Sequence, residues 1–173
     1  MNYMAKTHFC HISPINYLHL TKGREVHLTL AHLVDNQQYT NFYLEEKKKG
    51  STIIMDNSAF EFTQEGKGYL TGAEIVDYAK RINADYAVMT DYPGEDRQRT
   101  IDAAKEQAPL FKEAGLKTFF VPQGKVGDRD DYIECFRWGA ENPNLVNYIG
   151  VSILAVPNAY GIEPFGQEPS LHR

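Results

Sequence analysis

Three apolar runs of the sequence each end on a polar side chain that could take part in acid-base or hydrogen-bonding chemistry. The run "STIIM" stops on Asp56, "DYAVMT" stops on Asp91, and "KTFFVP" is followed by Gln123 and Gly124. A carboxylate can accept hydrogen bonds or exchange a proton, and a side-chain amide both donates and accepts. Together these groups could bind the polar edge of a planar heterocyclic ligand.

A fourth apolar run, "NYIGVSIL", contains Gly150, and a glycine there would let the backbone approach a ligand closely. Taken singly, each feature has a simpler explanation. An aspartate after a strand is more often a turn former or a helix cap, "PQG" can be an ordinary turn, and a glycine in a strand can serve packing. The shared position of all four at the ends of apolar runs favours a common site.

The elements that would position these residues are six apolar runs of strand length. Several are almost continuous in apolar, β-branched or aromatic residues, as expected for strands covered on both faces. The runs span residues 7–12, 25–33, 51–55, 85–90, 117–122 and 147–154.

Helical patterns lie between several of these runs. Residues 71–84 begin with Thr71 and place Glu74 at capping-box spacing. Residues 100–115 form a second pattern, in which Pro109 should kink or split the helix.

A third helical pattern covers residues 130–140 and predicts four packed apolar side chains before Gly139. They are Tyr132, Ile133, Phe136 and Trp138. Alternation of strands and helices at this spacing indicates βαβ units and a parallel sheet. The alternation alone does not distinguish a barrel from a doubly wound sheet, although no Gly-x-Gly-x-x-Gly follows the first run. In a barrel, the carboxyl ends of all strands meet at one rim.

Composition indicates one ordinary globular domain and gives little information on partners. The chain has 173 residues, 42% of them hydrophobic and 24% charged. A net charge of −5 does not favour a nucleic-acid binder, and Lys47 to Lys49 are expected at the solvated end of a helix. No apolar segment reaches the roughly 20 residues of a membrane helix and no signal peptide is evident, so a cytoplasmic location without membrane contact is expected. Cys10 and Cys135 are expected to be buried, reduced thiols.

Four stretches of the sequence, within residues 25 to 161, resemble motifs of the tRNA-guanine transglycosylase superfamily. "MDNSAFE" is similar to its Asp-Ser-Gly-Gly-Phe-Gln stretch, "TDYPGE" to its second aspartate motif, "VPQGK" to its Val-Gln-Gly-Gly turn, and "YIGVSIL" to its Gly-Gly segment. The likeness is greatest to the branch that acts on DNA, the deoxypurine-in-DNA protein A group. "AHLVD" and "GVSILAVPNAYG" also look like that branch.

The resemblance implies a TIM-type (β/α) barrel that exchanges guanine in DNA or tRNA for a 7-deazaguanine base such as preQ0, without a cofactor. Asp56 would then be the catalytic general base near the glycosidic bond, and Asp91 would read the base edge. Gln123 would bond the carbonyl oxygen and Gly150 would meet the ring substituent. Three further positions, Ser58, Phe60 and Gly124, would help to line the substrate pocket, although the family usually has glycine at the place of Ser58.

The departures from the family pattern leave several alternatives open. The nucleophilic aspartate of the family lies beyond the Gly-Gly segment, and the two cysteines do not match the family's zinc site. About six strands are too few to close a barrel. We therefore expect an incomplete barrel over residues 1–155 and an irregular tail over 156–173, with a further copy or a partner chain as a possible complement.

Two other functions compete with base exchange. A truncated relative could bind a purine or deazapurine without catalysis. A different barrel enzyme, such as a metal-dependent lyase or a phosphosugar enzyme, is the second alternative. Against it, the strand ends carry no His/carboxylate ligand set, and no glycine-rich phosphate cradle occurs late in the chain. Four irregularly spaced histidines in the N-terminal part are expected to be structural or to lie on the surface. They are His11, His19, His27 and His32.

Overall fold

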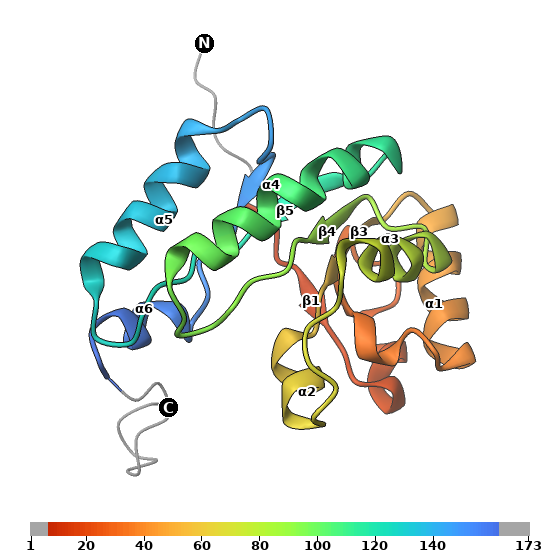
Figure 1. Cartoon of the computed structure of the whole chain (residues 1–173). Helices are drawn as coiled ribbons and strands as arrows, with labels where there is room; N and C mark the ends of the chain where they lie inside the picture. Colours follow the sequence, from red (N-terminus) through yellow and green to blue (C-terminus); the bar gives the residue numbers. More distant parts are fainter. Residues whose placement is uncertain (1–6, 163–173) are drawn as a thin grey trace.

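The chain folds into one parallel sheet with helices between its strands (Figure 1). The structure is a computed structural model and describes residues 7–162. Its elements in chain order are β1 (His11–Ile12), η1 (Ile15–Thr21), β2 (Val26–Leu30), η2 (Ala31–Leu33), α1 (Gln37–Lys48), β3 (Thr52–Asp56), α2 (Ala59–Gln64), α3 (Gly72–Arg81), β4 (Tyr86–Val88), α4 (Arg97–Glu113), β5 (Lys117–Phe120), α5 (Arg129–Glu141), β6 (Tyr148–Ile149) and α6 (Ala155–Ala159).

The six strands lie side by side in the order β1-β2-β3-β4-β5-β6, and every neighbouring pair is parallel. A doubly wound sheet reverses its strand order at a switch point, whereas successive strands of a (β/α) barrel do not. The predicted fold class, an incomplete TIM-type barrel, is confirmed. Within residues 7–162, β1 and β6 form the two edges and the sheet stays open.

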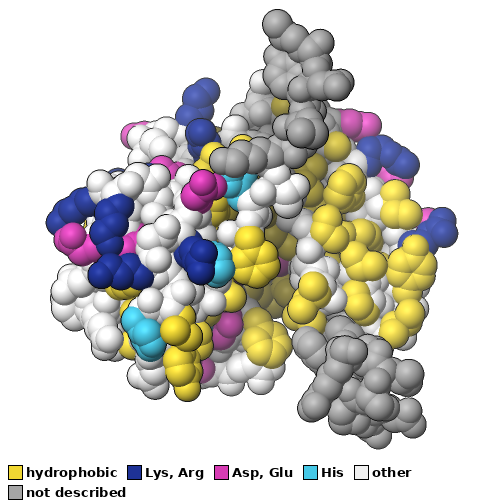
Figure 2. All heavy atoms as spheres, turned by 180° about the vertical axis from the view of Figure 1, so that it is seen from behind, with side chains coloured by type: hydrophobic (Ala, Val, Ile, Leu, Met, Phe, Trp, Pro, Cys, Tyr) yellow, Lys and Arg dark blue, Asp and Glu magenta, His cyan; other side chains and the backbone are white. Residues whose placement is uncertain are grey.

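Helices cover only one face of the sheet in the described residues. Along β3, Ile53 and Met55 are fully buried, whereas the alternating Ile54 and Asp56 point to the other face and are only partly buried. The expectation that the strands are covered on both faces is therefore wrong. Figure 2 views the molecule from behind and shows hydrophobic side chains gathered around a hollow. The open face of the sheet carries the clefts described below.

The predicted helices are present, with two differences. Thr71 and Glu74 form the expected capping box at the start of α3. Pro109 does not split α4, which runs without interruption from Arg97 to Glu113. Pro109 lies on the exposed side of that helix, where water can satisfy the carbonyl that its missing N–H leaves free. Helix α5 extends past Gly139, and the side chain of Phe136, predicted to be packed, is 39% exposed.

The end of the described chain is more regular than predicted. Helix α6 covers Ala155–Ala159, and Ala155 and Ala159 pack with Tyr132 of α5. The rest of the predicted irregular tail, residues 163–173, lies outside the described residues. A domain boundary at residue 155 stays a prediction.

The two cysteines differ in burial. Both are free thiols, but only Cys135 is buried, whereas Cys10 is partly exposed. Burial raises the pKa of both thiols, so neither is activated as a nucleophile. Separately, none of the helices in residues 7–162 has the length and apolar character needed to cross a membrane.

Candidate active site at the carboxyl ends of the strands

Asp56 is the last residue of β3 and has an unusual protonation equilibrium. Burial is the main cause that raises the pKa of its carboxyl to about 7; a hydrogen bond opposes the rise, and the nearby Asp91 and Glu61 contribute to it. That hydrogen bond comes from the backbone N–H of Ser58, which donates to Asp56 Oδ2 at 2.9 Å. A carboxyl group with this pKa can both give up and accept a proton near neutral pH.

Asp91 follows β4 and is held by two side-chain amides. Asn57 Nδ2 donates to Asp91 Oδ1 at 2.8 Å, and Gln123 Nε2 donates to Asp91 Oδ2 at 2.6 Å. Burial raises the pKa of Asp91, and the two amide hydrogen bonds counteract this by favouring the charged form. Asn57 also donates to the carbonyl oxygen of Met89, so it joins the ends of β3 and β4.

The other end of the Gln123 amide has no partner within the described part of the chain. Gln123 is 1% exposed, and its Oε1 is a buried acceptor without a hydrogen bond. Because Asp91 offers only acceptors when ionised, Nε2 must face Asp91 and Oε1 must face away from it. A buried acceptor that is left unpaired is unfavourable, so this atom is suited to accept a hydrogen bond from a ligand or from water.

These groups line a cleft of about 630 Å³ on the open face of the sheet. Its walls are mainly apolar. The charged residues in its described lining are Asp56, Glu61 and Asp91, and none of the described lining residues is Lys, Arg or His. The apolar lining includes Leu28, Leu30, Ile54, Phe60, Val88, Phe119, Val121, Val151, Ile153 and Leu154. The cleft therefore combines a low-polarity wall with acidic and amide groups.

Five of the predicted site residues lie together in this cleft, although their roles in binding stay predictions. They are Asp56, Phe60, Asp91, Gln123 and Gly150. A side chain on Gly150 would come within 2.5 Å of the Phe119 ring, so glycine keeps this wall of the cleft from crowding that ring.

Two of the predicted site residues lie behind the cleft and do not line it. Ser58 is fully buried and has left-handed backbone angles, with φ of 54°. Its Oγ contacts His32 instead of the cleft. Gly124 packs against helix α5, and a Cβ there would lie 2.6 Å from the backbone nitrogen of Tyr132. Both residues hold the loops that carry the site.

The sequence interpretation missed Asn57 and His32. Asn57 stands between Asp56 and Ser58 in a polar run after an apolar strand, and this local polarity was the available signal. His32 has no comparable signal, because its contact with Ser58 joins residues far apart in the sequence.

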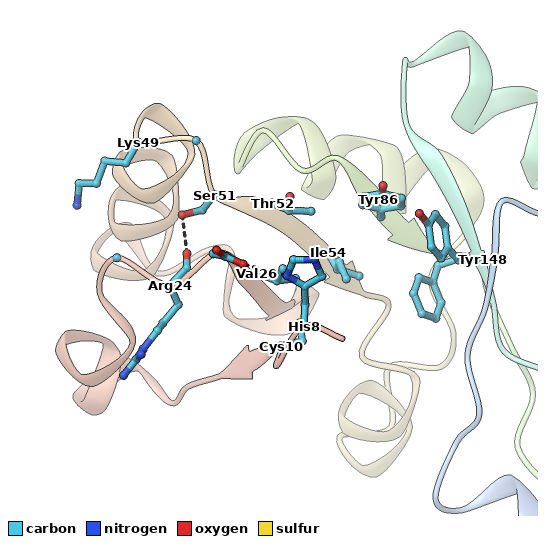
Figure 3. A pocket seen from close by; sticks show the side chains of 14 residues that line it. His8, Cys10, Arg24, Val26, Lys49, Ser51, Thr52, Ile54, Tyr86 and Tyr148 are labelled. Carbon is cyan, nitrogen blue, oxygen red and sulfur yellow. Dashed lines mark hydrogen bonds and ion pairs between the residues drawn. The ribbon is translucent and has the colours of Figure 1, made fainter. Parts of the chain in front are cut away.

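A second cleft, of about 700 Å³, lies toward the amino ends of the strands (Figure 3). The rings of Tyr86 and Tyr148 stand perpendicular at 5.0 Å, and His8 Nδ1 lies 2.9 Å from a carboxylate oxygen of Glu25. Both clefts share Ile54 in their lining, so they belong to the same open face. In the described residues, no unpartnered buried side-chain atom belongs to the lining of this second cleft. The described lining of the second cleft therefore has no counterpart to Gln123 Oε1, the unpaired acceptor beside the first cleft.

Comparisons with known proteins find similarity in structure but none in sequence families. No protein-family model matches the chain, and no curated protein matches it. Among solved structures, the tetrameric deoxyribose phosphate aldolase from Aeropyrum pernix is similar, with a TM-score of 0.46 and 15% sequence identity. The match covers 85% of this chain and 61% of the aldolase, so the chain spans less than two thirds of that protein's length.

These comparisons correct the family prediction. The assignment to the transglycosylase superfamily is wrong, because no protein-family model, of that superfamily or any other, matches the chain. The predicted exchange of guanine for preQ0 is overturned with it, and the non-catalytic deazapurine binder is no better supported. Short polar motifs misled the assignment because any (β/α) barrel concentrates polar residues and glycines at its strand ends. The base, nucleic-acid, oligomer and partner-chain predictions remain untested.

Proposed function

We propose that the cleft at the carboxyl ends of the strands is the active site of an enzyme that transfers a proton to or from a small molecule. The observation that carries the proposal is the position of Asp56 in this cleft, with a pKa of about 7. A general acid or base is most effective when its pKa lies near the working pH. Strongly perturbed carboxyl groups in a cleft are typical of catalytic sites.

Asp91 and Gln123 support a role in recognition beside Asp56. Asp91 is fixed by Asn57 and Gln123, so its position is set before a ligand arrives. The free Gln123 Oε1 can accept one hydrogen bond, which calls for an N–H or O–H group on the ligand. The apolar walls suit a ligand with an apolar body around that donor.

The charge of the cleft restricts the substrate further. Its lining combines acidic residues with no cationic side chain among the described residues, so an anionic ligand would be repelled without a counter-charge. A phosphate ester is therefore a poor candidate. The part of the lining that the structure describes also contains no lysine that could form a Schiff base with a carbonyl substrate. A small, uncharged organic molecule fits this cleft best.

A comparison of substrate turnover tests the proposal. Purified wild type, Asp56→Asn and the surface control Asp77→Asn are incubated with the small-molecule fraction of a cell extract, and mass spectrometry follows changes in abundance. We expect wild type and Asp77→Asn to convert the same compound and Asp56→Asn to lose at least about 100-fold in rate. Equal conversion by Asp56→Asn, or no conversion by wild type, would overturn the proposal. A cytoplasmic location stays a prediction from the sequence.

A further inference from the structure

The turn between β3 and α2 holds a serine in a conformation that usually requires glycine. Ser58 has φ of 54° and ψ of 36°, the left-handed region that residues with a Cβ rarely adopt. Such strained conformations persist where surrounding contacts fix them, and they occur often at functional sites. Ser58 is also fully buried, two residues after Asp56.

The contact that fixes Ser58 comes from a distant part of the chain. His32, in η2 after β2, places its Nδ1 3.0 Å from Ser58 Oγ. The backbone N–H of His32 donates to the same Oγ at 3.3 Å. The imidazole ring is itself held edge-to-face against Phe62 of α2, with ring centroids 6.2 Å apart. The hydroxyl of Ser58 is therefore attached at two points to the end of β2.

The backbone of Ser58 in turn contacts the carboxyl group of Asp56. Its N–H donates to Asp56 Oδ2 at 2.9 Å, and this hydrogen bond favours the ionised carboxylate. A rotation of the turn out of the left-handed region would move this N–H. The protonation and direction of Asp56 thus depend on the conformation of Ser58.

We infer that His32 is a positioning residue for Asp56, acting through the Ser58 hydroxyl. Its ring holds Ser58 in the left-handed turn, and the turn presents its N–H to the Asp56 carboxyl that faces the cleft. The inference rests on the proposed function only for the role of Asp56 in proton transfer. The link from His32 to Asp56 exists independently of any substrate.

The test is the pKa of the Asp56 carboxyl, followed by carbon-detected NMR in folded protein. His32→Ala should raise this pKa by about 0.5 or more, because the Ser58 N–H bond that favours the ionised form weakens. The amide of His32→Asn lies near the position of Nδ1, so this variant should keep the wild-type pKa of Asp56. The longer side chain of His32→Gln places its amide near the position of Nε2, so this variant should shift the Asp56 pKa as His32→Ala does. His19→Ala, at an exposed histidine, is the control.

A double-mutant cycle separates positioning from a general structural effect. Glycine adopts the left-handed conformation without strain, so Ser58→Gly keeps the turn but removes the hydroxyl. Adding His32→Ala to Ser58→Gly should then leave the Asp56 pKa unchanged. If His32→Ala does not fold, the His32→Asn and His32→Gln pair gives the same comparison. An unchanged Asp56 pKa in folded His32→Ala or His32→Gln, or an equal shift in the Ser58→Gly background, would overturn the inference. These results need no substrate, so they stand or fall separately from the turnover experiment.

Discussion

Gln123 Nε2 lies 2.6 Å from Asp91 Oδ2, and this hydrogen bond joins the segment after β5 to the segment after β4. The opposite oxygen of Asp91 accepts from Asn57 Nδ2, which follows β3. One carboxylate therefore ties together three consecutive strand ends. Changes at any of the three residues should alter both the stability of the rim and the cleft beside it.

Asn57→Asp should destabilise the protein strongly at neutral pH. The change replaces an amide donor to Asp91 with a second buried carboxylate, which removes a hydrogen bond and adds like-charge repulsion. We expect a loss of about 2–4 kcal/mol in the free energy of unfolding at about pH 8, and a smaller loss at about pH 4, where the pair can share a proton. Urea denaturation measures both values. Asn41→Asp on the exposed face of α1 is the control, and an equal effect of the two changes would contradict the assigned role of Asn57.

Asp56→Asn should make the protein more stable above neutral pH. The folded-state pKa of about 7 lies above the ordinary value of 3.8, so folding disfavours the charged form. Wild type should lose stability as the pH rises from about 4 to about 7, because the folded state holds the proton that the unfolded state releases. The variant should therefore gain on the order of 1–3 kcal/mol at about pH 8 and nothing at about pH 4. Denaturation curves at these two pH values measure the gain, with Asp77→Asn as the control. A gain in the free energy of unfolding that did not depend on pH would refute the prediction.

Gly124→Ala should cost more stability than Gly150→Ala. An added Cβ at Gly124 meets the backbone of Tyr132 at 2.6 Å, and helix α5 must shift to make room for it. At Gly150, the added atom meets the ring of Phe119 at 2.5 Å, and a side chain on the open face can move. We expect a loss of about 2 kcal/mol for the first change and less than about 1 kcal/mol for the second. Thermal and urea denaturation of both variants rank the two effects, and the reverse order would show the packing argument to be wrong.

His27→Leu should reduce the sensitivity of the protein to acid. The His27 side chain is fully buried in β2, and neither of its ring nitrogens has a hydrogen-bond partner within residues 7–162, although Nε2 lies 3.6 Å from a Glu46 oxygen. Burial lowers the pKa of His27 despite that carboxylate. Because the unfolded histidine titrates near about 6.5, wild type should lose stability as the pH falls below that value, until the folded-state pKa is reached.

The measurement for His27→Leu is the free energy of unfolding between about pH 7.5 and about pH 5, compared with wild type. The variant should stay within about 1 kcal/mol of wild type at the upper value, since no hydrogen bond is lost, and should show a flatter decline below it. His19→Gln at an exposed position is the control and should follow the wild-type curve. A parallel decline in wild type and His27→Leu would assign the acid sensitivity to other groups.

The strands and the meeting of their polar ends could be predicted from the sequence because both depend on local patterns. The apolar sequence run that contains Ile53 and Met55 forms strand β3, and the acidic residue Asp56 lies at the end of this strand as expected. Parallel strands in sequential order then bring Asp56, Asp91 and Gln123 to the same rim without further information.

The remaining features depend on contacts that no local pattern encodes. The left-handed turn at Ser58 is unfavourable for serine and needs His32 from another strand end. The continuity of α4 through Pro109 depends on which side of the helix meets solvent. The family prediction was wrong for a different reason, because barrels of unrelated function also carry a few polar residues at each strand end.

The sequential strand order also sets when the site can form as the chain is made. Each strand pairs with the one that precedes it in the sequence, so contacts can be added unit by unit from the amino terminus. Asn57 and Asp91 can be joined once β4 has emerged, but the bond from Gln123 must wait for the segment after β5. A nascent chain that stops before residue 123 therefore carries Asp91 with only one of its two amide partners. Completion of this hydrogen-bond pair fixes Asp91, and the wall of the cleft that contains Gly150 to Leu154 is added last.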